Sequence, residues 1–352
     1  MKIKKKYSKL RLSPFCHIVP SVGSASLGFI LVLLPQILML VLGKHYDSLI
    51  LMAVSVAACC AADFVANKMC GKKIFFDFNL IIEGLIVGMF IPQSYSPVLL
   101  FFIVFVGMLV CKYAFGGFAS GWVNPCAVVV IIAYFMGKRY FPGFLVDLSM
   151  LQTSNPAGAL FSAGVIQPVA SDFSITAGFN SFLSRYLGIV LPEGYVTLFL
   201  NTQSVIPALR YNFLTLLASF VLILLDMVDW IIPFCFLAVY AVLARCFALI
   251  PAGVLLNGDI LLALLTSGTL FAAFFLMPYY GTVPASILGK FVYGIIGGLA
   301  AFVICGCGTS HIGIVFTVIV TNLFSPVIQY LEEKCFSIFR IPKIKLRAEN
   351  ER

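Results

Sequence analysis

Glu83 is the residue of this sequence whose type and setting best suit it to chemistry. It lies between Ile82 and Gly84 in an apolar stretch that contains no other charge. A charge at the centre of a bilayer costs at least about 2.5–3.5 kcal/mol, so an ionisable residue in such a stretch is a functional hypothesis by default. A carboxylate there is suited to hold a cation or a proton. The alternative is a structural ion pair with Lys112, which lies in a later apolar stretch.

Two groups of small and helix-breaking residues interrupt other apolar stretches. The first group is Gly116, Gly117, Asn124 and Pro125, and the second is the run 267–269, which contains Ser267, Gly268 and Thr269. Within a membrane, the backbone groups freed by a broken helix are satisfied only by a buried ligand, water or neighbouring protein. The two interruptions are therefore expected to build a binding site.

Cysteines are numerous, but their spacing does not predict a metal site. Most of the 11 cysteines lie within apolar runs, where a thiol behaves as a small hydrophobic group. Neither the adjacent pair Cys59–Cys60 nor the pair Cys305–Cys307 has the spacing of zinc ligands. We expect no metal, and only Cys126 and the Cys305–Cys307 pair lie beside the predicted helix breaks.

The elements that must position these residues are membrane helices. The chain has 352 residues, of which 61% are hydrophobic and 11% charged, and its mean hydropathy is +1.07. Soluble proteins carry about 45–50% apolar and about 25% charged residues. This composition excludes a soluble enzyme, a nucleic-acid-binding domain and a secreted disulfide scaffold, and it predicts an all-α polytopic membrane protein that contacts the lipid bilayer.

About ten spans emerge when the sequence is measured against the roughly 20 apolar residues that cross a bilayer. The predicted spans are Ala25–Gly43, Leu49–Asn67, Phe78–Pro92, Pro97–Phe115, Pro125–Phe141, Leu209–Leu225, Trp230–Ile250, Asp259–Met277, Pro284–Cys305 and His311–Leu331. Basic residues cluster before the first span and after the last, so both termini are expected in the cytoplasm. This topology places the polar segment 142–207 outside, where it either carries a functional group or serves only as a docking surface.

An internal similarity suggests that the spans form two repeats. The stretches 77–92 and 259–278 each begin with Asp, continue through an apolar helix and end at Pro, and each is followed by a helix with a Gly-Gly pair. A unit of five spans must be inverted in its second copy, and inverted repeats with broken helices place binding sites near the bilayer midplane. The predicted parts are a basic N-terminus 1–24, repeat 1 at 25–141, the external segment 142–207, repeat 2 at 208–331 and a basic tail 332–352.

Several motifs resemble a known family. Gly116-Gly-Phe-Ala-Ser-Gly-Trp-Val-Asn124-Pro125 resembles the GG…NPA signature of the D subunit of the Rnf electron-transport complex, a signature that the B subunit of Na⁺-translocating NADH:quinone reductase shares. The runs Ser267–Phe275 and Gly313–Pro326 and the Trp230-Ile-Ile-Pro233 segment are similar to further family motifs, and they occur in the same order.

The resemblance implies a ten-helix fold related to urea transporters and a flavin-carrying subunit that passes electrons while the complex moves Na⁺ or H⁺. The expected partners are the other subunits of an Rnf-type complex, and the expected location is the cytoplasmic membrane of a bacterium. The resemblance also implies FMN joined by a phosphoester to a Thr of an SGAT motif, and it leaves open a non-covalent riboflavin. This chain has no SGAT, and Thr176 in Asp172-Phe-Ser-Ile-Thr176 is the expected attachment residue, unless the hydroxyls there merely solvate a loop.

The predicted site residues follow from both lines of reasoning. Gly116, Gly117, Asn124 and Pro125 would form the first part of a flavin-binding site, and Ser267, Gly268 and Thr269 the second, because small residues let a flat ring lie against backbone. Glu83 is the predicted residue for ion coupling. The family's M-A-T-D-P is replaced here by Leu276-Met-Pro-Tyr-Tyr280, so a carboxylate is missing and Tyr279 or Tyr280 is available to stack on the ring. The alternatives are a urea-transporter-like solute channel and a cofactor-free structural subunit of the same complex.

Overall fold

The architecture comes from a computed structural model, which describes residues 21–71, 77–117, 121, 123–143, 155–188, 190–249, 259–306 and 310–339. The described elements are helical throughout. Most of the basic N-terminus, the loop lysines Lys72 and Lys73, Cys307 and the end of the basic tail lie outside the described residues, and so do their predicted roles.

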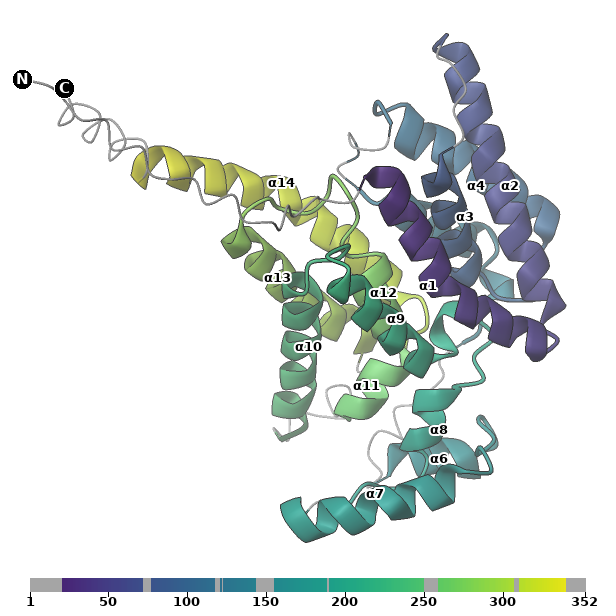
Figure 1. Ribbon diagram of the computed structural model, residues 1–352, viewed down its shortest axis with the longest axis vertical. Coiled ribbons are helices and arrows are strands. Elements are labelled where there is room, and N and C mark those ends of the chain that lie inside the picture. The colour runs from purple at the N-terminus through teal and green to yellow at the C-terminus, as the bar shows by residue number, and fades with distance from the viewer. Residues whose placement is uncertain are drawn as a thin grey trace, which may run out of the picture.

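Helices α1 to α5 make up the first half of the chain, which Figure 1 shows in purple and blue. Their bounds are α1 Val22–Leu42, α2 Tyr46–Met69, α3 Phe78–Phe90, α4 Pro97–Met108 with the π-helical turn η1 Leu109–Tyr113, and α5 Pro125–Met136 with the 3₁₀ turn η2 Lys138–Tyr140. Helix α2 packs against α3 and α4, and α4 packs against α5.

Helices α9 to α14 make up the second half, shown from green to yellow (Figure 1). Their bounds are α9 Asn212–Leu224, α10 Ile231–Leu249, α11 Ile260–Thr266, α12 Thr269–Phe275, α13 Ile287–Cys305 and α14 Gly313–Phe339. Helix α10 packs against α11, α12 and α13, and α13 packs against α14. The helix α14 continues to Phe339, beyond the boundary at residue 331 that the sequence predicts for repeat 2.

Membrane-crossing length is reached by four of the described helices, which are α1, α2, α13 and the part of α14 up to Lys334. Five shorter apolar stretches, α3, α4 with η1, α5, α9 and most of α10, accompany them. The chain is therefore an all-α, multi-pass membrane protein, as its composition predicts.

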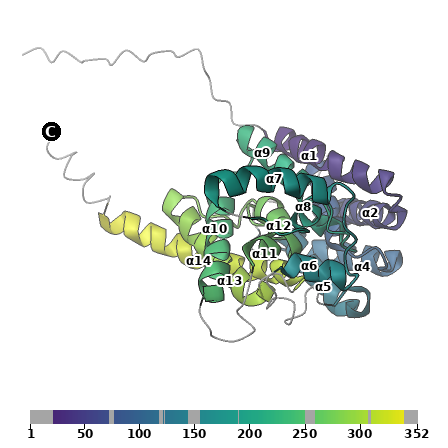
Figure 2. The same ribbon diagram turned by 90° about the horizontal axis from the view of Figure 1, so that it is seen from below.

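The described part of the segment between the halves contains three helices and a 3₁₀ turn, whereas the sequence suggests a polar loop. It contains α6 Pro156–Ser162, α7 Asp172–Leu187, α8 Tyr195–Leu200 and the 3₁₀ turn η4 Pro207–Leu209. We call α6, α7 and α8 the outer layer. Figure 1 shows this layer below one end of the bundle, with α7 lying crosswise beneath α11, and Figure 2 shows the same layer face-on.

Close helix contacts in both halves rest on glycines spaced four residues apart. A Cβ added at Gly84 or Gly88 of α3 would lie 2.5 Å from Val56 Cα or 2.6 Å from Met52 Cα of α2. The Gly294–Gly298 pair of α13 meets α10 in the same way. Small residues at this spacing let membrane helices approach closely, since lipid tails supply no hydrophobic drive for association.

Candidate functional site

The two predicted interruptions occur at the predicted residues. The Asn124 side chain caps α5 by accepting hydrogen bonds from the backbone N–H groups of Cys126 at 2.9 Å and Ala127 at 3.4 Å, and Pro125 is the first residue of the helix. Asn is a preferred N-cap and Pro a preferred first residue, so the local sequence fixes this start. Gly268 has φ +70°, a conformation open mainly to glycine, and it separates α11 from α12.

Asn124 joins the two halves of the chain, because its amide also donates to the carbonyl oxygen of Leu276 at 2.9 Å. Leu276 directly follows α12, where the chain leaves the helix towards Pro278. The first interruption therefore lies against the end of α12.

Glu83 lies beside this junction and is fully engaged. Its carboxylate accepts hydrogen bonds from Lys112 Nζ at 2.7 Å, from the Asn79 amide at 2.9 Å and from the Tyr279 hydroxyl at 3.0 Å. Glu83 is 1% exposed and Lys112 4% exposed, so both charges are removed from solvent. The ion pair between Glu83 and Lys112, one of the two alternatives from the sequence, is present.

Two partners of Glu83, Lys112 and Tyr279, lie where the backbone departs from a regular α-helix. Lys112 lies in the π-helical turn η1 at the end of α4, and such turns are rare and frequently found at functional sites. Tyr279 follows the break after α12 and brings the second half of the chain to a carboxylate of the first.

A small cavity at this junction is lined in part by Glu83, Asn124, Cys126, Phe275 and Tyr279, and its volume is about 30 Å³. A cavity needs roughly 10–15 Å³ to hold one water molecule, whereas pockets for small organic ligands occupy about 300–1,000 Å³. This space has room for a water molecule or a small cation. It is too small for a tricyclic ring.

Ser267, Gly268 and Thr269 do not line that cavity. Ser267 and Thr269 donate to the carbonyl oxygens of Ala263 and Leu264 at 2.7 and 2.9 Å, and a Cβ on Gly268 would lie 3.0 Å from Leu209. The reason is that Ser267 and Gly268 precede α12 whereas Leu276 follows it, so the two ends of α12 contact different parts of the protein.

Gly116 and Gly117 also lie away from the cavity lining. Their φ values of +103° and +108° end the helix that carries Lys112, and the Gly117 N–H donates to the Lys112 carbonyl oxygen at 3.1 Å. Their observed role is to terminate this segment.

Thr176 is buried in α7 at 2% exposure, and its hydroxyl donates to Asp172 at 3.0 Å. Asp172 also accepts from the Thr197 hydroxyl and from the backbone N–H groups of Thr197 and Gly194 at 2.8 and 3.3 Å. Burial alone raises the pKa of Asp172, but these hydrogen bonds from Thr197, Thr176 and Gly194 outweigh it and hold the pKa below its ordinary value. The hydrogen bonds between Asp172 and Thr197 therefore hold α7 against α8.

A flavin does not fit the predicted residues in this conformation, on three observations. The cavity at Asn124 holds about 30 Å³, and the Thr176 hydroxyl faces a carboxylate inside the outer layer. Tyr279 is bonded to Glu83 and so is not placed as a stacking platform.

His311 is a site residue whose environment the sequence does not reveal. It is 7% exposed, it precedes α14, and its Nδ1 has no hydrogen-bond partner in the described part of the chain. Burial lowers its pKa to about 4. It lines a second cavity, of about 270 Å³, together with Tyr134, Lys138, Phe141 and Ser310. No group of three His, Cys, Asp or Glu side chains placed to hold a metal occurs within the described ranges.

Asn79 and Tyr279 are the partners that sequence reasoning missed. Asn79 could have been found, since it precedes Glu83 by four residues and thus shares its face of a helix. Tyr279 gives no such signal, because 196 residues separate it from Glu83.

Comparison with known proteins decides the family. The sequence model of the NQR2, RnfD, RnfE family matches residues 9–336 of the chain. The chain belongs to this family.

Three relatives illustrate the similarity of this family member, and each is named as the D subunit of its complex. The chain is 25% identical to that of an ion-translocating oxidoreductase complex from Actinobacillus succinogenes, with 91% of this chain and 95% of the relative covered. It is 23% identical to that of the Na⁺-translocating ferredoxin:NAD⁺ oxidoreductase complex from Acetobacterium woodii, covering 94% and 96%. It is 20% identical to that of the proton-translocating ferredoxin:NAD⁺ oxidoreductase complex from Clostridium ljungdahlii, covering 93% and 95%.

Proposed function

We propose that this protein is the D-type membrane subunit of an ion-translocating ferredoxin:NAD⁺ oxidoreductase complex of the Rnf type. The observation that carries the proposal is the family match across residues 9–336, together with relatives that are named as the D subunit and are covered almost end to end. Its partners are then the other subunits of that complex and the lipid bilayer. The protein lies in the cytoplasmic membrane with both termini inside.

The proposed architecture is two inverted repeats of five spans. The first comprises α1, α2, α3, α4 with η1, and α5, and the second comprises α9, α10, the pair α11–α12, α13 and α14. The similar packing of α2 on α3 and α4 and of α10 on α11, α12 and α13 supports this assignment.

Glu83 is the proposed site of ion coupling, because a buried carboxylate, an aromatic hydroxyl and a cavity of about 30 Å³ meet where the two halves touch. Lys112 neutralises the carboxylate in this conformation. An ion that enters must compete with Lys112 for the carboxylate. Because Lys112 lies in η1, binding of the ion would be linked to a shift of η1.

The test uses the assembled complex. An affinity tag on this chain should co-purify the other subunits, and vesicles containing the complex should couple ferredoxin oxidation by NAD⁺ to ion uptake. Proteoliposomes with this chain alone should show no urea flux. Failure to co-purify subunits, combined with solute flux by the chain alone, would support the solute channel.

Covalent FMN at Thr176 stays a prediction, and a flavin when bound would supply one-electron and two-electron transfer. Attachment requires the Thr176 hydroxyl to leave Asp172. A fluorescent band that survives denaturing electrophoresis and disappears in Thr176→Ala would establish the linkage, with Ser174→Ala as the neighbouring control. A complex that is active while this chain carries no fluorescence would favour the cofactor-free subunit.

A further inference from the structure

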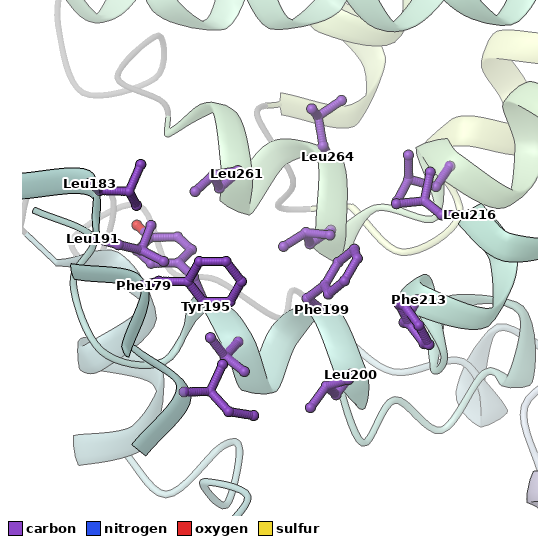
Figure 3. Close-up of a pocket in the computed structure, with 14 residues that line it drawn as sticks. Phe179, Leu183, Leu191, Tyr195, Phe199, Leu200, Phe213, Leu216, Leu261 and Leu264 are labelled. Carbon is purple, nitrogen blue, oxygen red and sulfur yellow. The ribbon is translucent and has the colours of Figure 1, made fainter. Parts of the chain in front are cut away.

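An apolar pocket of about 450 Å³ lies between the outer layer and the membrane helices. Figure 3 shows side chains converging on it from α7, α8, α9 and α11, including Phe179, Leu183, Phe199, Leu216 and Leu264. Its volume lies within the range of small-molecule sites. It is separate from the cavity at Glu83, and it does not depend on the electron-transport role proposed above.

The occupant must be a hydrocarbon. Tyr195 is the only one of the fourteen described lining residues with a side-chain polar atom, and its hydroxyl donates to Asp259. A flavin or another polar heterocycle would lose its hydrogen bonds to water there and gain none, which is unfavourable. An alkyl chain makes no hydrogen bonds to water, so it loses none on entering the pocket.

The helix α9, which lines the pocket, also carries an exposed apolar surface. Phe213 and Leu216 of α9 line the pocket, and the exposed residues Leu217, Phe220 and Leu224 continue along the same apolar helix. An alkyl chain that enters along this helix therefore meets apolar side chains.

Helix α7, which covers the pocket, has the composition of a membrane-interface helix. It exposes four aromatic side chains, at Phe173, Phe179, Phe182 and Tyr186, and Phe and Trp are common on the apolar face of helices that lie in the membrane interface. Its only basic residue, Arg185, is exposed. Figures 1 and 2 show α7 lying across the end of the bundle, as an interfacial helix does.

We propose that this pocket binds one acyl chain of an anionic phospholipid, whose phosphate lies beside Arg185. The chain fills the apolar space and fixes the outer layer to the membrane helices. Arg185 selects for negative charge, because a basic residue at the membrane surface favours anionic lipid by about five-fold.

The experiment is native mass spectrometry of the purified protein after exchange into a 1:1 mixture of dioleoylphosphatidylglycerol and dioleoylphosphatidylcholine in detergent. The wild-type protein should retain one phosphatidylglycerol through mild delipidation. Leu216→Trp should place an indole ring in the pocket and lower retention about ten-fold. Leu323→Trp is the control, because Leu323 is an exposed leucine of α14 that does not line the pocket, and this variant should retain lipid. If Leu216→Trp does not fold, Leu261→Trp fills the pocket from the opposite wall.

The headgroup is tested separately with Arg185→Gln, which should lower the preference for phosphatidylglycerol about five-fold, while Arg139→Gln should not. Equal retention by the wild-type and pocket-filled proteins would overturn the proposal. So would a co-purified quinone that disappears on filling, or cross-links from Phe179 to another protein of the complex with no lipid retained.

Discussion

Removing Lys112 alone should harm the protein more than removing Lys112 and Glu83 together. Glu83 accepts hydrogen bonds from Lys112, Asn79 and Tyr279 at 2.7, 2.9 and 3.0 Å, and both charged residues are at most 4% exposed. Lys112→Met leaves a buried carboxylate without its counter-charge. Glu83→Gln with Lys112→Met removes both charges and leaves an amide that can still accept from Asn79 and Tyr279.

The magnitudes follow from the burial of this pair. Breaking a buried ion pair by removing one partner costs about 3–5 kcal/mol, whereas replacing both partners is often neutral. We therefore expect Lys112→Met to lower the free energy of unfolding by about 3–5 kcal/mol and the double variant to lie within about 1 kcal/mol of the wild-type protein. Lys290 and Asp229, whose side chains are 19% and 56% exposed, form the control pair, for which Lys290→Met should cost less than about 1 kcal/mol.

The assay combines unfolding in mixed detergent micelles with ion uptake by vesicles that contain the complex. The free energy of unfolding measures the structural contribution of the Glu83–Lys112 pair. The number of ions taken up per electron transferred measures coupling. The double variant should be stable but should no longer couple electron transfer to ion uptake, with subunit content unchanged. Full coupling in the double variant would refute the coupling role and leave a structural ion pair. A double variant as unstable as Lys112→Met would refute the electrostatic reasoning.

Two further predictions concern Asn124 and His311. Asn124→Ala should lower the free energy of unfolding by about 2–3 kcal/mol, since it removes an N-cap and leaves the buried Leu276 carbonyl unpaired. Ser21 is the control, an exposed N-cap of α1 that bonds locally to Ser24; Ser21→Ala should cost about 1 kcal/mol, and equal losses would contradict the inter-half role of Asn124. For His311 the pKa is about 4 in the folded protein against 6.5 for the unfolded chain. As the pH falls below about 6.5, the unfolded chain takes up a proton that the folded protein does not, so stability falls between pH 6.5 and pH 4. Thermal unfolding from pH 7.5 to pH 5 should show a loss of about 2 kcal/mol that His311→Gln lacks, and an identical pH dependence in the two proteins would refute the buried neutral imidazole.

The sequence by itself determined that the chain is an all-α membrane protein, where its apolar helices lie and where helices break. These follow from local physics. Apolar runs in a chain with 61% hydrophobic residues must cross a bilayer. Asn124-Pro125 starts a helix through its own side chain and ring, and Gly268 at φ +70° ends one because other residues rarely adopt that conformation.

Only the tertiary structure decided which of these features meet. Glu83 and Lys112 are 29 residues apart and Glu83 and Tyr279 are 196 apart, so no periodicity links them. Ser267 and Thr269 match the expected motif, yet they bond within their own segment and lie away from Asn124. The hydroxyl of Thr176 reads as exposed in a polar stretch but turns inward to Asp172. Hydrogen bonds and ion pairs of this kind depend on how helices pack, and packing in lipid is set by close van der Waals contact at glycines such as Gly84 and Gly88, which a pattern of apolar residues does not encode.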